Sequence, residues 1–288
     1  MAAPYAPFGL GKAWRTAAAV GSKPVTAAAM VGHQARFIAL SLRAIPFVLV
    51  TYPKHVLAHI SSVVFGNGAI VVGGGMLGVL AFMGLAMGGT IAIQGFSLLD
   101  MVNMGPLTGV ISAYATTREL GPLIAAIGFA AQVGCRITAE IGAMRMAEEL
   151  DALEGFAIRP IPFVVTTRII AGVVAILPLY LLTLVVAYLT CEVMVSVVNG
   201  QSSGTYSHYF SSFIGISDIV FSLIKAMVFA IAVVLIHSYQ GFYATGGPEG
   251  VGVAAGRAIR ASLVAVVSLD MLMTLLFWGF DSGMRITG

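Results

Sequence analysis

The chain has 288 residues, of which 59% are hydrophobic and only 9% are charged, and its formal net charge is +3. Soluble domains carry about a quarter charged residues, so this composition excludes a soluble globular protein and indicates an integral membrane protein. A spanning helix needs about 20 mainly apolar residues, and five stretches qualify: roughly 68–96, 106–134, 163–195, 213–240 and 258–281. The sequence therefore predicts an all-α membrane protein with five transmembrane helices.

Residues 1–60 are predicted to form a cytoplasmic extension ahead of a transmembrane domain at 61–288. The extension lacks the compact apolar core and small-residue cleavage site of a signal peptide. Between residues 34 and 60, apolar residues mix with basic residues and histidines, which is typical of a helix in the headgroup layer, here broken near Pro46 and Pro53. A disordered basic tail is the alternative. The basic residues of the extension are Lys12, Arg15, Lys23, Arg36, Arg43 and Lys54.

The first span, GAIVVGGGMLGVLAFMGLAMGGTIAIQG, contains two GxxxG pairs, Gly74 with Gly78 and Gly84 with Gly88. Small residues at this spacing let helices approach closely in lipid. The pairs have two interpretations. They mark either a functional surface, which is a subunit interface or a helix that must slide, or ordinary helix packing within the chain.

Ionisable residues inside the spans are costly unless they are paired or face water. Arg118 and Glu119 fall in the second span, Lys225 in the fourth and Asp270 in the fifth. Glu119 and Lys225 are predicted to pair across two helices. Such a polar spot indicates either a site for a ligand with a charged head or a structural ion pair that fixes helix register.

The segment RMAEELDALEGFAIRPI, residues 145–161, is an acidic stretch in an otherwise apolar chain. At helical period its apolar residues share one stripe and its acids point the other way. Gly155 is expected just past the helix end, and Pro160 and Pro162 prevent continuation. An acidic face suits a basic groove on a soluble protein better than a negatively charged leaflet. The stripe consists of Met146, Leu150, Leu153 and Ala157, and the acidic face of Glu148, Asp151 and Glu154.

The basic residues also predict the topology. Residues 97–105 and 196–212 contain no Lys or Arg. The positive-inside rule therefore places the N-terminus, the acidic segment and the 241–257 loop in the cytoplasm, and the C-terminus outside, with Arg285 as an exception. Cys135 and Cys191 then lie near opposite membrane faces, where they cannot form a disulfide. The other cytoplasmic basic residues are Arg136, Arg145, Arg159, Arg168, Arg257 and Arg260.

The sequence offers no catalytic or nucleotide site. Gly11–Lys12 lacks the remainder of a phosphate-binding loop, so ATP, if used, must bind another chain. His55 and His59 lack the glutamate of a zinc protease motif, and no metal site is predicted. An ATP-independent secondary transporter or channel for amphiphilic solutes is the alternative function, although the odd number of spans and the absence of repeats count against it.

Several segments together resemble the MlaE/YrbE permease family, the membrane subunits of lipid-transporting ABC systems. They are RELGPLIAAIGFAAQVGCRITAEIGAMRMAEELDALEGFAIRPI (118–161), SLIKAMVFAI (222–231), GGPEGVGVAAGRAIRASLVAVVSLD (246–270) and the Gln94–Gly95 step. The similarity covers roughly residues 65–281. The N-terminal extension and the ELDALE form are most similar to the YrbE branch encoded with Mce proteins in actinobacteria.

The resemblance implies a permease dimer in the bacterial inner membrane, with a heterodimer of two YrbE-type chains favoured, and Mce-domain rings outside. Residues 143–155 would be the coupling helix that docks on a dimer of cytoplasmic ATPases, which bind ATP and Mg²⁺. This chain would then be a non-catalytic subunit without a cofactor of its own. The candidate ATPase contacts are Glu148, Glu149, Leu150, Asp151, Leu153 and Glu154.

The resemblance also implies a lipid site between the two permease subunits. The lipid would be a fatty acid, mycolic acid, sterol or phospholipid. Asp100 and Asn103 make this region more polar than a pure acyl slot. The candidate lipid-binding residues are Ile91, Leu98, Leu99, Val102 and Leu120, with Arg118, Glu119 and Lys225 at the family's charged positions.

Overall fold

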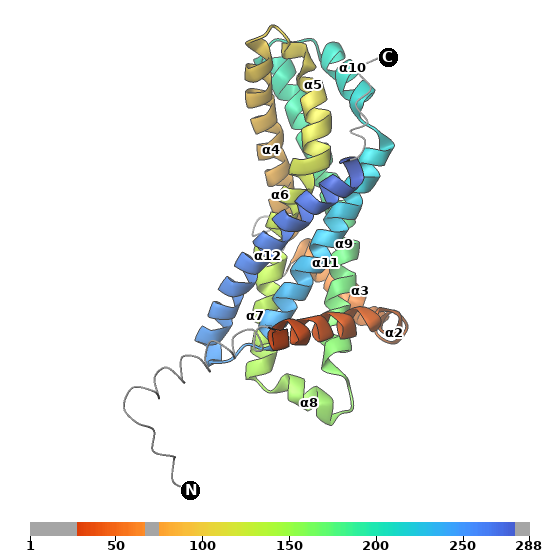
Figure 1. Ribbon diagram of the computed structural model, residues 1–288, viewed down its shortest axis with the longest axis vertical. Coiled ribbons are helices and arrows are strands. Elements are labelled where there is room, and N and C mark those ends of the chain that lie inside the picture. The colour runs from red at the N-terminus through yellow and green to blue at the C-terminus, as the bar shows by residue number, and fades with distance from the viewer. Residues whose placement is uncertain (1–27, 67–74, 280–288) are drawn as a thin grey trace, which may run out of the picture.

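The computed structural model describes residues 28–66 and 75–279, and all regular structure in these two ranges is helical. Five helical segments are long and apolar enough to cross a membrane, which confirms the predicted all-α fold and agrees with the five predicted spans. They run roughly side by side along the long axis of the molecule (Figure 1). The segments are Gly75–Asp100, Gly105–Met146, Ile161–Val198, Ile216–Phe242 and Gly247–Trp278.

The second, third and fifth spans are longer than the apolar stretches that predict them. The fifth, α12 (Gly247–Trp278), begins well before residue 258 because Pro248 stands in its first turn, where the missing N–H costs nothing. Gly246 precedes it with φ +94°, a conformation that favours glycine. Residues 68–74 of the first predicted span and 280–281 of the fifth lie outside the described residues.

The second and third spans contain several π-helical turns. In the second span, η2 (Ser112–Leu120) ends just before Gly121–Pro122, and its wider turns accommodate a proline that cannot donate a hydrogen bond. In the third span, Pro178 lies inside α9 (Thr167–Val193), which continues through it. The remaining segments are η1 (Gly105–Leu107), α5 (Thr108–Ile111), α6 (Gly121–Phe129), η3 (Ala130–Gly134), α7 (Cys135–Met146), η4 (Ile161–Thr166) and η5 (Met194–Val198).

The GxxxG pair at Gly84 and Gly88 brings α4 (Gly75–Asp100) against α9. A Cβ atom at Gly84 would lie 2.6 Å from the carbonyl oxygen of Thr183, and one at Gly88 would overlap the carbonyl of Ala187. This pair therefore serves packing within the chain, because any larger residue would separate the two helices. Gly74, from the other pair, lies outside the described residues.

Helix α11 (Ile216–Phe242) occupies the centre of the bundle and packs against α6, α7, α9 and α12. Phe229 and Val233 of α11 are fully buried in the main core, together with Phe129 of α6. Helix α12 is the least buried of the five spans. Its outer face, which includes Met271, is therefore available to lipid or another subunit.

The segment predicted as a broken helix over 34–60 is helical, so the alternative of a disordered tail is wrong there. The helix Ala28–Arg43 bends by 43° into α2 (Ile45–Thr51), and together they are also long and apolar enough to be a sixth candidate span. Pro46 stands in the first turn of α2, and Pro53 begins α3 (Pro53–Phe65). The predicted breaks are thus confirmed. The Ala28–Arg43 helix lies across the long axis (Figure 1).

The acidic segment forms a shorter helix than predicted. Helix α7 ends at Met146, Glu148 takes φ +57°, and only α8 (Glu149–Gly155) follows. The continuous helix over 143–155 is therefore wrong, and the reason is packing: the turn lets α8 fold back so that Leu150 is buried in the main core. Gly155 is the last helical residue, and Ala157 takes the left-handed conformation expected of a glycine beyond the helix end.

The ends of the bundle carry different elements. Helix α8 lies at the same end as the Ala28–Arg43 helix, α2 and α3, whereas α10 (Ser203–Phe213) lies at the opposite end with the α4–α5 connection (Figure 1). The acidic segment and the broken N-terminal helices are therefore at one end, as the predicted topology requires. Helix α3 packs along α9 and runs past residue 60, and the division into 1–60 and 61–288 stays a prediction.

Candidate functional site

Lys225 is the centre of a charged cluster inside the spans. Its side chain is 0% exposed, and its Nζ lies 2.6 Å from Asp270 Oδ1 and 3.5 Å from Glu119 Oε2. It also donates hydrogen bonds to the carbonyl oxygen of Arg118 and the hydroxyl of Thr274. The predicted pairing of Glu119 with Lys225 is present, but Asp270 lies closer to the ammonium group than Glu119 does. These contacts tie the second, fourth and fifth spans together.

A second ion pair continues this cluster. The guanidinium of Arg118 lies 3.1 Å from Asp218 Oδ1 and 4.1 Å from the centre of the Tyr114 ring. Asp218 also accepts hydrogen bonds from Trp278 Nε1 at 2.9 Å and from the backbone N–H of Gly215 at 3.3 Å. A buried charge is tolerated when it is paired and hydrogen-bonded in this way.

We call these five charged residues the intramembrane charge network. They provide two cations and three carboxylates, so the network has a formal charge of −1 when all are ionised. Such groups are expensive in the hydrocarbon layer and mark functional positions in membrane proteins. Glu119 is the one most open to its surroundings, with 39% of its side chain exposed. The network consists of Arg118, Glu119, Asp218, Lys225 and Asp270.

A cavity of about 340 Å³ opens beside Arg118. Arg118 and Asp218 provide its charges, and Tyr114, Phe221 and Trp278 provide aromatic walls. A compact polar group could therefore bind here against the guanidinium, with aromatic surface around it.

The predicted apolar lipid contacts are not brought together into one cavity within a single chain. Ile91 is buried in the smaller core cluster, with Ala187 of α9. Leu98 and Val102 are 65% and 61% exposed near the end of α4, Leu99 is half-buried, and Leu120 is exposed beside Glu119. Each of these exposed apolar side chains would have to be covered by lipid or by a second subunit.

Helix α8 presents an acidic surface. Its carboxylates are exposed, and the guanidinium of Arg145 donates a hydrogen bond of 2.8 Å to Asp151. Leu150 is 1% exposed and Leu153 is half-buried against the same core, so both anchor the helix from beneath. The exposed acids are Glu148, Glu149, Asp151 and Glu154.

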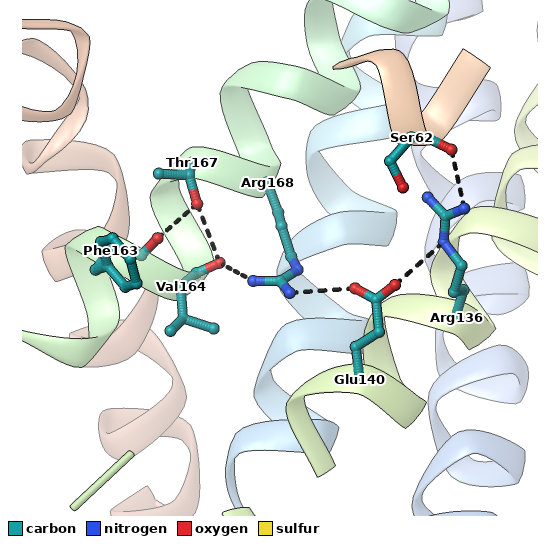
Figure 2. Close-up of polar contacts among 7 residues, drawn as sticks. All are labelled: Ser62, Arg136, Glu140, Phe163, Val164, Thr167 and Arg168. Carbon is teal, nitrogen blue, oxygen red and sulfur yellow. Dashed lines mark hydrogen bonds and ion pairs between the residues drawn. The ribbon is translucent and has the colours of Figure 1, made fainter. Parts of the chain in front are cut away.

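A second charged cluster joins α7, α9 and α3 at the same end of the bundle as α8. Figure 2 shows Glu140 between two arginines: Oε2 lies 3.1 Å from Arg168 Nη2, and Oε1 lies 3.5 Å from Arg136 Nε. Arg136 also donates to the carbonyl of Ser62 at 2.9 Å, and Arg168 donates to that of Val164 at 2.8 Å. The two helices that flank α8 are thus bridged by a carboxylate.

His59 of α3 faces this cluster. Burial lowers the pKa of His59 to about 4, and the charge of nearby Arg168 adds to the effect. A neutral imidazole is expected there, because a third positive charge beside the two arginines would be unfavourable.

Sequence reasoning missed several of these residues. Glu140 was detectable as an acid four residues after Arg136 within an apolar helix. Asp218 was detectable as an acid in the first turn of a spanning helix. Thr274 and Trp278 lacked any such signal, since an apolar helix with one threonine or tryptophan is ordinary.

Comparisons with known proteins give a consistent result. Residues 65–276 match the family described as Permease MlaE. The intermembrane phospholipid transport system permease protein MlaE of Haemophilus influenzae is 30% identical over 210 residues, which cover 73% of this chain and 80% of that protein. A probable ABC transporter permease protein of Rickettsia prowazekii is 29% identical over 218 residues, 73% of this chain and 81% of that protein. The Arabidopsis thaliana protein TRIGALACTOSYLDIACYLGLYCEROL 1, chloroplastic, is 29% identical over 202 residues, 70% of this chain and 58% of that protein.

Proposed function

The chain belongs to the MlaE permease family, and from that membership we propose that it is the permease subunit of an Mce-type ABC transporter that moves lipids across or out of the bacterial inner membrane. As a family member it is a multi-pass membrane permease, a non-catalytic component of its transporter. The observation that carries the proposal is the match over residues 65–276. The match includes the acidic helix between the second and third spans, and it covers all five spans except the last two residues of the fifth.

The proposed orientation has α8 and the N-terminal helices in the cytoplasm. Arg43, Lys54 and Arg145 belong to elements at this end and Arg257 to the first half of α12, which begins there, whereas residues 97–105 and 196–212, at the other end, contain no Lys or Arg. The positive-inside rule favours this orientation. With five spans, the end of α12 is then on the outer side.

Helix α8 is the proposed contact with a cytoplasmic ATPase. Its exposed carboxylates suit a basic groove, and buried Leu150 with half-buried Leu153 would transmit a push on the helix to the core beneath it. ATP and Mg²⁺ would bind the ATPase and not this chain.

The lipid site is proposed between two permease subunits. The exposed positions Leu98, Val102 and Leu120 would become enclosed when a second subunit covers them, and Leu99 would join them. Arg118 and Glu119 of the charge network would bind the polar head, because they border the exposed side of the network. Lys225 would hold Glu119 in place. An apolar enclosure with few fixed charges suits an amphiphile.

Partners and substrate follow from the branch that the sequence resembles. We propose a heterodimer with a second YrbE-type chain and Mce-domain rings on the outer side. The substrate would be a fatty acid, mycolic acid, sterol or phospholipid; the relative from Haemophilus influenzae is named for phospholipid transport.

The ATPase contact can be tested by reversing the charge of α8. Glu148→Lys with Asp151→Lys should abolish co-purification of the ATPase while membrane insertion stays normal. The matched control is Glu249→Lys, which reverses an exposed acid in the first turn of α12, at the same end but outside α8. If the α8 variant keeps its ATPase, or if the control loses it equally, the coupling role is wrong and an ATP-independent carrier gains support.

The lipid site can be tested independently. Leu99→Arg should block lipid loading, read by mass spectrometry of lipids bound to the purified complex, without loss of the ATPase. Leu99→Met is the matched control because it conserves volume and polarity. Normal loading in the arginine variant would show that the site lies elsewhere.

A further inference from the structure

A cavity of about 700 Å³ lies between the transverse N-terminal helices and the connection from α8 to η4. One wall comes from the Ala28–Arg43 helix and α2 through Leu40, Arg43 and Phe47. Arg159 lies on the facing connection, and Phe242 closes the side at the end of α11. The volume is within the range of cavities that bind small ligands, and its walls are mainly apolar.

The charges of this cavity are unbalanced. Arg43 and Arg159 are exposed side chains, and neither forms an ion pair with a carboxylate of residues 28–66 or 75–279. The guanidinium of Arg159 lies over Phe47, 5.8 Å from the ring centre, which directs it along the cavity wall. Glu154 is the only acid among the lining residues. The cavity therefore has a net positive charge and attracts an anion from outside the chain.

The position of the cavity restricts what that anion can be. The Ala28–Arg43 helix lies across the bundle (Figure 1), as expected of a helix in the headgroup layer. The cavity lies against this helix and α2 and is therefore at the depth of the lipid phosphates in the proposed orientation. Basic pockets at this depth on the cytoplasmic side suit anionic headgroups.

We propose that this cavity binds the phosphate headgroup of an anionic phospholipid from the cytoplasmic leaflet. Arg43 and Arg159 would hold the phosphate, and Leu40, Phe47 and Phe242 would contact the first carbons of the acyl chains. The inference rests on the proposed orientation but not on the transport path, because Leu98, Leu99 and Val102 lie near the opposite end of the bundle. A lipid held here would fix the α8–η4 connection to the bilayer surface.

The test compares lipid retention by the full transporter complex. The complex is washed with detergent, reconstituted into phosphatidylcholine nanodiscs with or without phosphatidylglycerol, and released for native mass spectrometry. The wild type should retain phosphatidylglycerol in preference to phosphatidylcholine. Arg43→Gln with Arg159→Gln should weaken that retention about 30-fold, the size expected for two basic side chains near an anionic surface.

Two further variants separate the cavity from general surface charge. Arg257→Gln with Arg260→Gln removes the same charge from exposed arginines of α12 that do not line the cavity, and it should retain the lipid. Leu40→Trp fills the cavity without changing charge and should lose the lipid.

Each outcome of these measurements either supports the lipid site in the cavity or contradicts it. Equal loss in the Arg257/Arg260 variant would show a surface-charge effect only, and unchanged retention in both cavity variants would overturn the site. If the cavity variants keep the lipid and lose the ATPase, the cavity is a protein contact and the proposal is wrong. Retained phosphatidylglycerol in Leu99→Arg, with transport lost, would separate this site from the transport site.

Discussion

Replacing Lys225 by methionine is the sharpest test of the intramembrane charge network. Lys225 is fully buried, with Asp270 at 2.6 Å and Glu119 at 3.5 Å from its ammonium group. Methionine has a similar length but no charge, so both carboxylates would lose their cation. Removing one partner of a buried ion pair costs about 3–5 kcal/mol because the remaining charge is uncompensated. We therefore expect Lys225→Met to lose this amount of stability, measured by denaturant unfolding in detergent.

A second variant distinguishes electrostatics from lost packing. Lys225→Met combined with Asp270→Asn removes both charges of the shorter pair, and Glu119 is 39% exposed, so its charge can reach polar surroundings. The double variant should regain about half or more of the lost stability, since two contacting residues are not additive. If Lys225→Met costs less than about 1 kcal/mol, or if the double variant is no more stable than the single one, the network does not hold the spans together.

Three further predictions concern packing and charge at other positions. Gly88→Val should destabilise the protein by about 1–3 kcal/mol because its side chain would overlap the backbone of α9, whereas Gly89→Val, which points into open space, should be tolerated; thermal unfolding tells them apart. Glu140→Gln should leave the buried arginine of α9 without its carboxylate and cost about 3 kcal/mol, and a loss no greater than that of an exposed Glu→Gln change would contradict the bridge. Since the pKa of His59 is lowered to about 4, the unfolded chain binds a proton below pH 6.5 while the folded chain does not, so stability should fall from pH 6.5 to 4. His59→Gln should flatten that dependence in unfolding curves.

Much of the fold was predictable because it depends on local properties of the chain. Apolar runs of sufficient length identify spans wherever they occur, and proline fixes helix starts, as Pro46 and Pro53 do. The prediction of a continuous helix over 143–155 was wrong because no local signal in the sequence reveals that burial of Leu150 makes the chain turn at Glu148.

The sequence predicted most of the charged residues of the candidate site, but not which of them contact one another. The cost of charge in lipid singles out Arg118, Glu119, Lys225 and Asp270 from the sequence. Whether the members of such a group meet depends on how each helix is rotated about its axis, and only the packing of neighbouring spans fixes that rotation. Asp218 is harder to identify as a member of the network from the sequence alone. An acid in the first turn of a helix is also explained by its favourable interaction with the helix dipole.

The sequence by itself determined that this protein is a bundle of five apolar spans with an acidic helix between the second and third, because length, hydropathy and proline act over a few turns of chain. The tertiary structure alone decided that Lys225 binds Asp270 more closely than Glu119, that Glu140 bridges Arg136 and Arg168, and that Gly88 packs on α9. The bridge to Arg168, the pairing with Asp270 and the packing of Gly88 join residues from different helices. The energy of such contacts depends on distances of a few ångströms that no single helix defines.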